Sequence, residues 1–412
     1  MIYYSINDIN LKGDILKADP APYRSLCTDC GISRTDQPKR CGQACQFIQP
    51  DYPKLESQVH GRARNYHENN ELHFGPYLKM FQAALTPPIQ GAQWTGITTR
   101  IGEKLLESKM VDAVLTMTYD QDDFWKPVPI LIENAKDMAK CRGMRMGYAP
   151  LLSLLEPAIA KGIKKIAVIG IPCQVYALRS IEKELGLEKL YVIGTPCSDN
   201  TTTENFHHFL SLISDQPSEI NYLEFRADYH VEVRFKNGKK REIPFLQLPL
   251  STLPNDFFPL TCRTCVDYTN VLSDITVGYM AGNGEQWLIV RNQRGEELLH
   301  LLGDEVHLQE PMSAGKRRSA VIGFKKNVEL AAGGLPIRKM PNWIRPIVAW
   351  LMPKIGPRGI EFAKTRVEMK AIESIIHLRR EHPAKMSTMI PNHVWELVKQ
   401  YDLNSQKDEL KN

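Results

Sequence analysis

Nine cysteines are the residues of this sequence whose type and spacing most clearly predict chemistry. A chain of 412 residues can bury enough apolar surface to fold without disulfides, so clustered thiols are better explained by metal binding or redox chemistry. Four of them fall within nineteen residues, in a polar segment without clear periodicity: Cys27, Cys30, Cys41 and Cys45. This spacing suits a structural zinc ion and an iron–sulfur cluster equally well, and inert cysteines are the remaining alternative.

Four further cysteines come from two repeated segments and a later pair. The segments IAVIGIPCQ and LYVIGTPCS each carry a short apolar strand pattern into a Pro-Cys dipeptide, which contains Cys173 or Cys197. If the two strands are parallel neighbours, both thiols lie at the edge where open α/β sheets bind ligands. Alternatively, each Pro-Cys ends a strand with a small buried residue. Cys262 and Cys265 could complete this set, which leaves Cys141 alone.

Two sets of four cysteines in one chain favour electron transfer over two zinc sites, because a chain rich in apolar strands gains little additional fold from metal ions. An iron–sulfur centre carries one electron at a time. A reductase that acts on a carbon–carbon or carbon–oxygen bond therefore needs a two-electron carrier, usually a flavin, between cluster and substrate.

Three segments could contact a flavin. Their candidate residues are Thr95, Gly96, Thr98, Thr99, Arg142, Gly147, Tyr148, Asp274 and Gly278. The first four open a predicted helix, whose free N–H groups would bind a phosphate, although an ordinary threonine-capped helix has the same pattern. The next three belong to a loop with two glycines and two arginines, which suits a dinucleotide or a solvated turn. The last two closely follow the Cys262 and Cys265 pair.

The elements that must position these residues alternate between helix and strand patterns. Helical spacing occurs at residues 97–109, 151–161 and 175–185, and each is followed by a predicted strand, at 111–117, 166–169 and 190–193. This alternation favours a parallel sheet. A period of two around an Asn-Gly turn predicts a β-hairpin over 231–243, and apolar steps of three and four predict a packed helix from Ile360 to Leu378.

Composition limits the partners and the compartment. The 52 Lys and Arg against 47 Asp and Glu leave a formal charge of +5, which is too small a surplus to predict nucleic-acid binding. The first twenty residues contain three aspartates and no long apolar run, so neither a secretory nor a transit signal is expected. No run reaches the roughly 18 apolar residues of a spanning helix. We therefore expect an intracellular protein.

Two basic segments could contact partners. Lys316–Arg318 with Lys325 and Lys326 could dock an acidic electron carrier, or form a solvated basic face. Residues 336–358 combine aromatic and aliphatic side chains with five Lys or Arg and no acid. This segment could lie on a membrane surface or cover an apolar pigment, and packing against the core or a neighbouring subunit is the alternative.

Taken together, these segments resemble the β-subunit family of deazaflavin-reducing hydrogenases and dehydrogenases. The resemblance covers roughly residues 22–325 and rests on WTGITTRIGEKLLESKMVDAVL, GIPCQVYALRSI and CRTCVDYTNVLSDITVGYM. Within the family, the N-terminal cysteine segment, VHGRAR and GYMAGNGEQWLIVRN resemble the chlorophyll-pathway branch. That branch contains a ferredoxin-dependent divinyl chlorophyllide 8-vinyl reductase and a 7-hydroxymethyl chlorophyll a reductase.

The resemblance implies one FAD and two 4Fe-4S clusters. The cluster nearer the flavin would be held by Cys173, Cys197, Cys262 and Cys265, and the other by Cys27, Cys30, Cys41 and Cys45. Ser33 stands where the plant 7-hydroxymethyl reductases have a third closely spaced cysteine, so Cys41 would serve instead. This departure favours the vinyl reductase.

The resemblance implies ferredoxin-dependent reduction of the 8-vinyl group of divinyl chlorophyllide or protochlorophyllide a to ethyl, in chlorophyll biosynthesis. The alternatives are a 7-hydroxymethyl chlorophyll a reductase and an electron-transfer β subunit of a deazaflavin-linked complex. Tyr148 and Cys141 are candidates for the proton donor, although a tyrosine in a glycine-rich loop is more often a packing or stacking residue. The expected partners are reduced ferredoxin and a chlorophyll-type pigment, with peripheral membrane contact and a homo-oligomer as further expectations. The expected location is the bacterial or cyanobacterial cytoplasm, including the thylakoid surface.

The predicted fold class is α/β, with a parallel or mixed sheet core, helices, an added β-hairpin region and a helical tail. We divide the chain into an N-terminal iron–sulfur segment (1–60) and an α/β flavin-binding domain (85–215). A second family domain with the CxxC pair and the hairpin (216–335) and a C-terminal helical tail (336–412) follow.

Overall fold

The computed structural model describes residues 26–37, 39–48, 50–68, 70–226, 228–279 and 285–410. Two expectations concern residues outside these ranges. They are the lack of a targeting signal at the N-terminus and residues 280–284 of the chlorophyll-branch motif.

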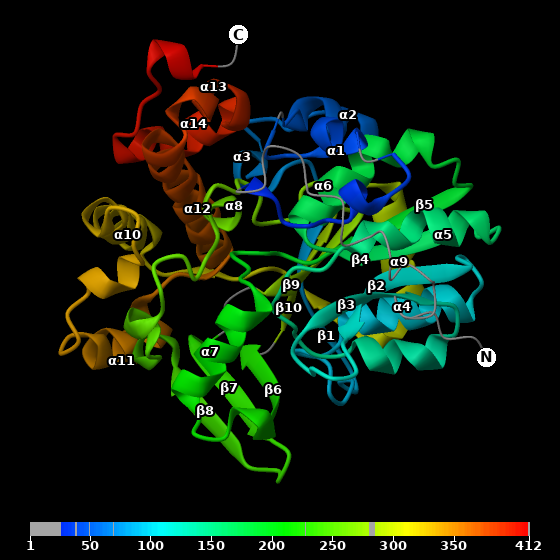
Figure 1. Cartoon of the computed structure of the whole chain (residues 1–412), viewed down its shortest axis with the longest axis horizontal. Coiled ribbons are helices and arrows are strands. Elements are labelled where there is room, and N and C mark those ends of the chain that lie inside the picture. The colour runs from blue at the N-terminus through cyan, green and yellow to red at the C-terminus, as the bar shows by residue number, and fades with distance from the viewer. Residues whose placement is uncertain are drawn as a thin grey trace.

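An eight-stranded mixed sheet forms the centre of the described chain (Figure 1). Its order is β11-β1-β10-β9-β5-β4-β2-β3, in which β2, β4, β5 and β9 run parallel and the remaining pairs are antiparallel. The strands are β1 (Lys79–Leu85), β2 (Ala113–Tyr119), β3 (Pro127–Ile132), β4 (Lys165–Gly170), β5 (Lys189–Gly194), β9 (Ile275–Tyr279), β10 (Gln286–Val290) and β11 (Val306–Gln309). The prediction of an α/β fold with a mixed sheet is confirmed.

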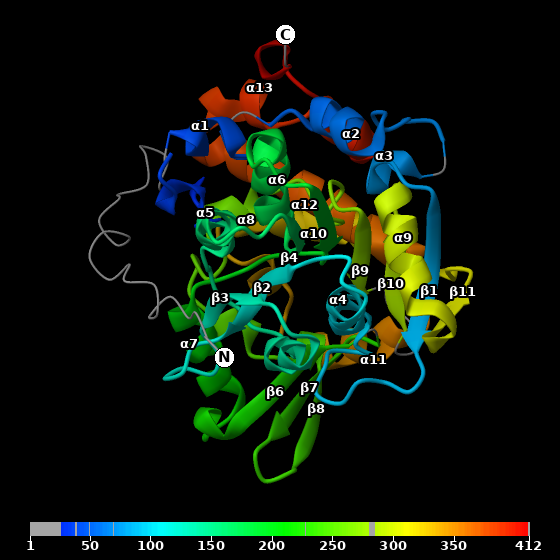
Figure 2. The same cartoon turned by 90° about the vertical axis from the view of Figure 1, so that its right-hand side faces the viewer.

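The remaining strands of the described chain form two smaller sheets. The predicted hairpin forms as β7 (His230–Phe235) and β8 (Lys240–Pro244), and β6 (Ile220–Phe225) adds a third strand. This three-stranded sheet projects from one end of the molecule in both views (Figure 1, Figure 2). The short strands β12 (Ser313–Ala314) and β13 (Arg358–Gly359) pair separately. The large sheet takes strands from both sides of residue 215, so that boundary does not separate two sheets.

Helices cover both faces of the large sheet. Successive side chains along its parallel strands point to opposite faces, and both faces are buried. Ile166 and Val168 of β4 pack on one side with the buried residues of α5 and α6, whereas Ala167 and Ile169 pack on the other side with those of α4 and α9. The helices that lie before β6 are α1 (Arg40–Ala44), α2 (Tyr52–His60), α3 (Glu71–Phe74), α4 (Ile97–Glu107), α5 (Leu155–Ala160), α6 (Pro172–Ile181) and α7 (Thr203–Ile213).

The C-terminal part of the described chain is helical, as predicted. The helices that follow β8 are α8 (Leu260–Arg263), α9 (Gln293–Leu302), α10 (Arg317–Ala331), α11 (Arg345–Ile355), α12 (Ile360–Glu381), α13 (Met386–Met389) and α14 (Asn392–Val398). The predicted apolar stripe of α12 is buried at Ala363, Val367, Ala371, Ile375 and Leu378. The stripe packs in a core shared with α14 and with Trp287 of β10.

Gly278 in β9 allows the loop that follows β5 to lie directly against the strand. A Cβ atom at this position would lie 2.2 Å from Cδ of Pro196, the residue before Cys197. The proline ring is rigid, so one of the two backbones would have to move. Gly278, predicted as a flavin contact, therefore positions the Pro196–Cys197 loop in this structure.

We predict that Gly278→Ala destabilises the protein by about 1–3 kcal/mol, as overpacking does in other cores. The matched control is Gly323→Ala in α10, where an added Cβ meets nothing within 4 Å and alanine favours the helix by about 1 kcal/mol. Urea unfolding followed by circular dichroism measures both midpoints. Equal midpoints for Gly278→Ala and the wild-type protein would contradict the close contact.

Candidate functional site

The parallel register of β4 and β5 brings Cys173 and Cys197 to one edge of the sheet. Gly170 pairs with Gly194, an offset of 24 residues that equals the separation of the two cysteines. Both thiols therefore follow the carboxyl end of their strand by three residues. Cys173 lies in the first turn of α6, and the Cys197 N–H donates to the Tyr268 carbonyl at 3.0 Å. The predicted position of the two cysteines is confirmed.

Cys262 and Cys265 join these two thiols, and the four are called the second thiol set. Burial raises the pKa of Cys173 and of Cys197 well above that of an ordinary thiol, and the charges of the other thiols of the set raise both further. Burial raises the pKa of Cys265 to about 12. Without a bound cation these thiols stay protonated at neutral pH, so a metal centre at this place would displace their protons.

Cys27, Cys30, Cys41 and Cys45 converge in the same way, and they are called the first thiol set. Burial is the main cause of the raised pKa of Cys30, and the charges of Cys45, Cys41 and Cys27 follow. Burial raises the pKa of Cys45 to about 12. Cys41 thus lies near other thiols of this set, and its role as a ligand stays a prediction. The donor types of both sets fit a thiolate-bound metal centre.

Two side chains connect the thiol sets directly. Gln46, which follows Cys45, donates from Nε2 to the Cys265 sulfur at 3.6 Å, and its Oε1 accepts from the Tyr52 hydroxyl at 2.9 Å. Thr28, which follows Cys27, hydrogen-bonds to the Cys173 thiol and lowers its pKa. A residue adjacent to a cysteine of one set therefore contacts a sulfur of the other set at two places. Thr28 and Gln46 were not predicted from the sequence, in which their only signal is their position after a cysteine.

The loop after Cys265 holds the two Pro-Cys segments together. Asn270 donates from Nδ2 to the Gly170 carbonyl at 2.8 Å and to the Thr195 carbonyl at 3.3 Å. The buried Asp267 carboxylate in turn accepts from the Asn270 and Val271 N–H groups. The ends of β4 and β5 and the CxxC loop thus form one hydrogen-bonded unit.

The loop from Cys141 to Tyr148 extends from α4 to the second thiol set. At one end, Arg142 forms an ion pair with Glu103 of α4 at 3.2 Å. At the other end, the Tyr148 hydroxyl lies 3.3 Å from the Cys262 sulfur. The Gly147 N–H donates to Asn200 Oδ1 at 3.0 Å. Tyr148 and Gly147 therefore lie beside the second thiol set, and their contact with a flavin stays a prediction.

The residues at the start of α4 form hydrogen bonds within the protein. The Thr95 hydroxyl donates to Gln286 Oε1 at 2.8 Å, and the same oxygen accepts the Ile97 N–H at 3.1 Å. Gly96 has a left-handed φ of 93° and no room for a Cβ. Thr99 is buried and Thr98 is half-buried. The phosphate-binding role of these four residues also stays a prediction.

Asp274 lies in a buried network of charges. Its Oδ1 accepts from Arg179, Asn292 and Arg294, each at 2.8 Å, and its Oδ2 accepts the Val192 N–H at 2.7 Å. These contacts hold the pKa of Asp274 below its usual value despite burial. They tie β5 to β9, and a flavin contact of Asp274 stays a prediction.

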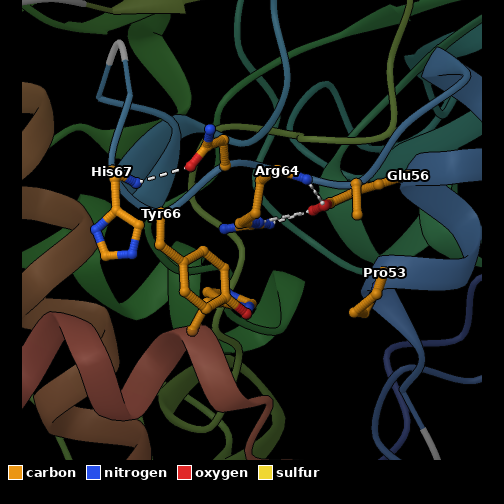
Figure 3. A pocket seen from close by; sticks show the side chains of 8 residues that line it. Pro53, Glu56, Arg64, Tyr66 and His67 are labelled. Carbon is orange, nitrogen blue, oxygen red and sulfur yellow. Dashed lines mark hydrogen bonds and ion pairs between the residues drawn. The ribbon is translucent and has the colours of Figure 1, made fainter.

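A cavity of about 380 Å³ opens beside α2 and α14 (Figure 3). It is lined by Pro53, Glu56, Ala63, Arg64, Asn65, Tyr66, His67 and His393. Arg64 donates from Nε to Glu56 Oε1 at 2.8 Å, and burial followed by the Arg64 charge lowers the pKa of His393 well below its usual value. None of these lining residues belongs to a thiol set or to the predicted flavin contacts.

Among the described residues, no group of three or more His, Cys, Asp or Glu side chains is arranged to hold a metal ion, and this includes the cysteines of both thiol sets. The same part of the chain contains no helix that is long and apolar enough to cross a membrane.

Two residues of the predicted basic docking surface, Arg317 and Lys325, have partners within the protein. Arg317 forms ion pairs with Glu361 and Glu368 of α12, and Lys325 donates to the Tyr401 carbonyl. Lys316 and Lys326 remain exposed.

The mixed sheet with helices on both faces defines this chain as an α/β protein. Residues 80–156 match the N-terminal part, and residues 163–313 the C-terminal part, of the coenzyme F420 hydrogenase/dehydrogenase beta subunit. The chain belongs to this family of oxidoreductases, in the branch that includes a chlorophyll-pathway reductase.

The relatives support this placement. The chain is 34% identical to the chloroplastic 7-hydroxymethyl chlorophyll a reductase of Oryza sativa subsp. japonica, over 92% of this chain and 83% of the rice protein. It is 35% identical to an uncharacterised protein of Nostoc sp., over 93% and 95% of the two chains. A chain of the F420-reducing [NiFe] hydrogenase complex from Methanosarcina barkeri has the same fold, with a TM-score of 0.52 and 21% identity over 59% of this chain and 84% of its own.

We predict that the Cys141 thiol reacts slowly, because burial raises its pKa to about 12 and the thiolate is the reactive form. At pH 8, iodoacetamide should label Cys141 in the native protein at least about tenfold more slowly than in the urea-unfolded chain, since each pKa unit removes about nine-tenths of the thiolate. The rate should rise with pH. Peptide mass spectrometry measures it, and equal rates in both states would contradict the shift.

Proposed function

We propose that each thiol set holds one 4Fe-4S cluster and that the loops beside the second set bind FAD. When bound, these groups would carry single electrons and deliver them in pairs to a substrate. The proposal is supported by the four cysteines of each set, whose charges act on one another, and by the contacts of Thr28 and Gln46 between the sets. The chain's own residues would fix the two centres relative to each other and exclude water from the thiols.

The order of the two centres follows from exposure. The first thiol set includes Cys41 in α1, beside the exposed residues Gly42 and Gln43, so it is the place where an external donor could approach. The second set is next to Tyr148, in the loop proposed to contact the flavin. We infer that electrons enter at the first set, from reduced ferredoxin, and leave from the second. Burial and the neighbouring Cys262 thiol raise the pKa of Tyr148, and burial raises the pKa of Cys141 to about 12, so both candidate proton donors hold their protons firmly.

The proposed substrate is a divinyl chlorophyllide or protochlorophyllide a, whose 8-vinyl group would take up two electrons and two protons to become ethyl. Ser33 in place of a cysteine of the plant 7-hydroxymethyl reductases favours this choice. The second candidate is 7-hydroxymethyl chlorophyll a, favoured by the 34% identity to the rice enzyme. A third candidate is electron transfer to a deazaflavin, since the chain is 26% identical over 58% of its length to a component of the F420H2 dehydrogenase of Methanosarcina mazei.

The three candidates are tested by one anaerobic assay with reduced ferredoxin. We predict that divinyl chlorophyllide gives the ethyl product, followed by chromatography, while 7-hydroxymethyl chlorophyll a and a deazaflavin turn over at least about tenfold more slowly. Faster turnover of the hydroxymethyl pigment would replace the first candidate with the second. Exclusive reaction with the deazaflavin would make the chain an electron-transfer protein of a larger complex.

We also propose that the exposed face of α11 and the turn that precedes it contact an anionic membrane surface. Trp343, Ile347 and Trp350 are separated by four and three residues and are 73%, 51% and 63% exposed. Lys354 lies 3.6 Å from the centre of the Trp350 ring. Residues 336–358 carry five basic side chains and no acid, a charge that matches anionic headgroups.

We predict that the protein sediments with vesicles of phosphatidylglycerol and not with those of phosphatidylcholine. The double variant Trp343→Ala/Trp350→Ala should lose this binding, whereas Leu78→Ala, a change at another exposed apolar residue, should keep it. Unchanged binding of the double variant would contradict the proposal. So would a homo-oligomer that dissociates only in the double variant, because α11 would then contact a second copy of the chain.

A further inference from the structure

Helix α12 lies beyond both matched ranges of the family and still contacts the loops of the second thiol set. Lys370 donates from Nζ to Asp199 Oδ1 at 2.8 Å and also to the Cys262 carbonyl. Ser374 donates to the Cys265 carbonyl at 3.0 Å, and Arg366 donates to the Ser198 hydroxyl at 3.2 Å. One face of α12 is thus bonded to the backbone or neighbours of Cys197, Cys262 and Cys265.

Lys370 and Asp199 place two opposite charges beside these thiols, away from solvent. The Lys370 side chain is 3% exposed and that of Asp199 is 17% exposed. Glu373 also faces Lys370 at 3.8 Å, and His377 and Arg366 act on Glu373. A buried ion pair contributes little net stability, because desolvation offsets the attraction between its charges. The burial of Lys370 and Asp199 beside the thiols therefore needs an explanation other than a contribution to folding stability.

We propose that Lys370 and Asp199 set the reduction potential of the metal centre in the second thiol set, in opposite directions. Reduction adds an electron to the centre, so a nearby fixed cation raises the potential and a nearby fixed anion lowers it. Burial keeps both effects large because few water molecules and ions screen them. Lys370 is a positioning and tuning residue, since it acts through the groups that surround the thiols. This proposal rests on the cluster proposed above.

The test is a redox titration of the anaerobically purified full-length protein, followed by visible absorbance and electron paramagnetic resonance. Lys370→Met should shift the midpoint potential of one centre to more negative values, and Asp199→Asn should shift the same centre to more positive values. Lys370→Arg, which keeps the charge, should remain near the wild-type value. The matched control is Lys364→Met on the same helix, because the charges that act on Lys364 are Glu361, Arg317 and Glu368 and not the thiols.

Shifts of the same sign for Lys370→Met and Asp199→Asn, or shifts no larger than that of Lys364→Met, would overturn the proposal. If Lys370→Met loses iron, the opposite shifts are sought instead in Asp199→Asn and in Lys370→Met/Asp199→Asn, which removes both charges of the Lys370–Asp199 pair. The double variant should then lie more negative than Asp199→Asn alone, and equal potentials would overturn the proposal. A wild-type protein without a reducible iron centre would instead refute the proposed function.

Discussion

The in-register pairing of β4 and β5 is the constraint on which the site depends. It matches Gly170 with Gly194 and so places Cys173 and Cys197 at equal heights beyond the sheet. A slip of one residue would shift one loop along the sheet relative to the other, and it would exchange the side chains that the strand presents to the two layers of helices. The contacts of Asn270 with the carbonyls of Gly170 and Thr195 then bring the CxxC loop to the same place.

The first thiol set depends on this arrangement in turn. Its segment has only short helices of its own, and it is fixed where Gln46 reaches Cys265 and Thr28 reaches Cys173. The same side chains that hold the segment in place also make it a neighbour of the second set. The same contacts would thus stabilise the fold and hold the two centres near each other. Helix α12 adds contacts to the second set through Lys370 and Ser374.

The sequence predicted the parts of the fold whose signal is local. The repeated Val-Ile-Gly and Pro-Cys segments predicted the two neighbouring strands and the shared edge, and the spacing of apolar residues predicted α12. The antiparallel pairing of β1 with β10 and β11 was missed, because it joins residues about 200 positions apart and leaves no local pattern. Lys370 was missed for a related reason, since a lysine among apolar helical positions looks like a solvated residue until Asp199 is seen beside it.

We propose that the two thiol sets hold two iron–sulfur centres close enough to exchange electrons. It is tested most directly by electron paramagnetic resonance of the fully reduced, anaerobically purified protein. We predict two centres whose signals are broadened by mutual magnetic coupling, and a single uncoupled signal when Cys197→Ser disrupts the second set. Two uncoupled signals in the wild-type protein, or bound zinc in place of iron, would contradict the claim.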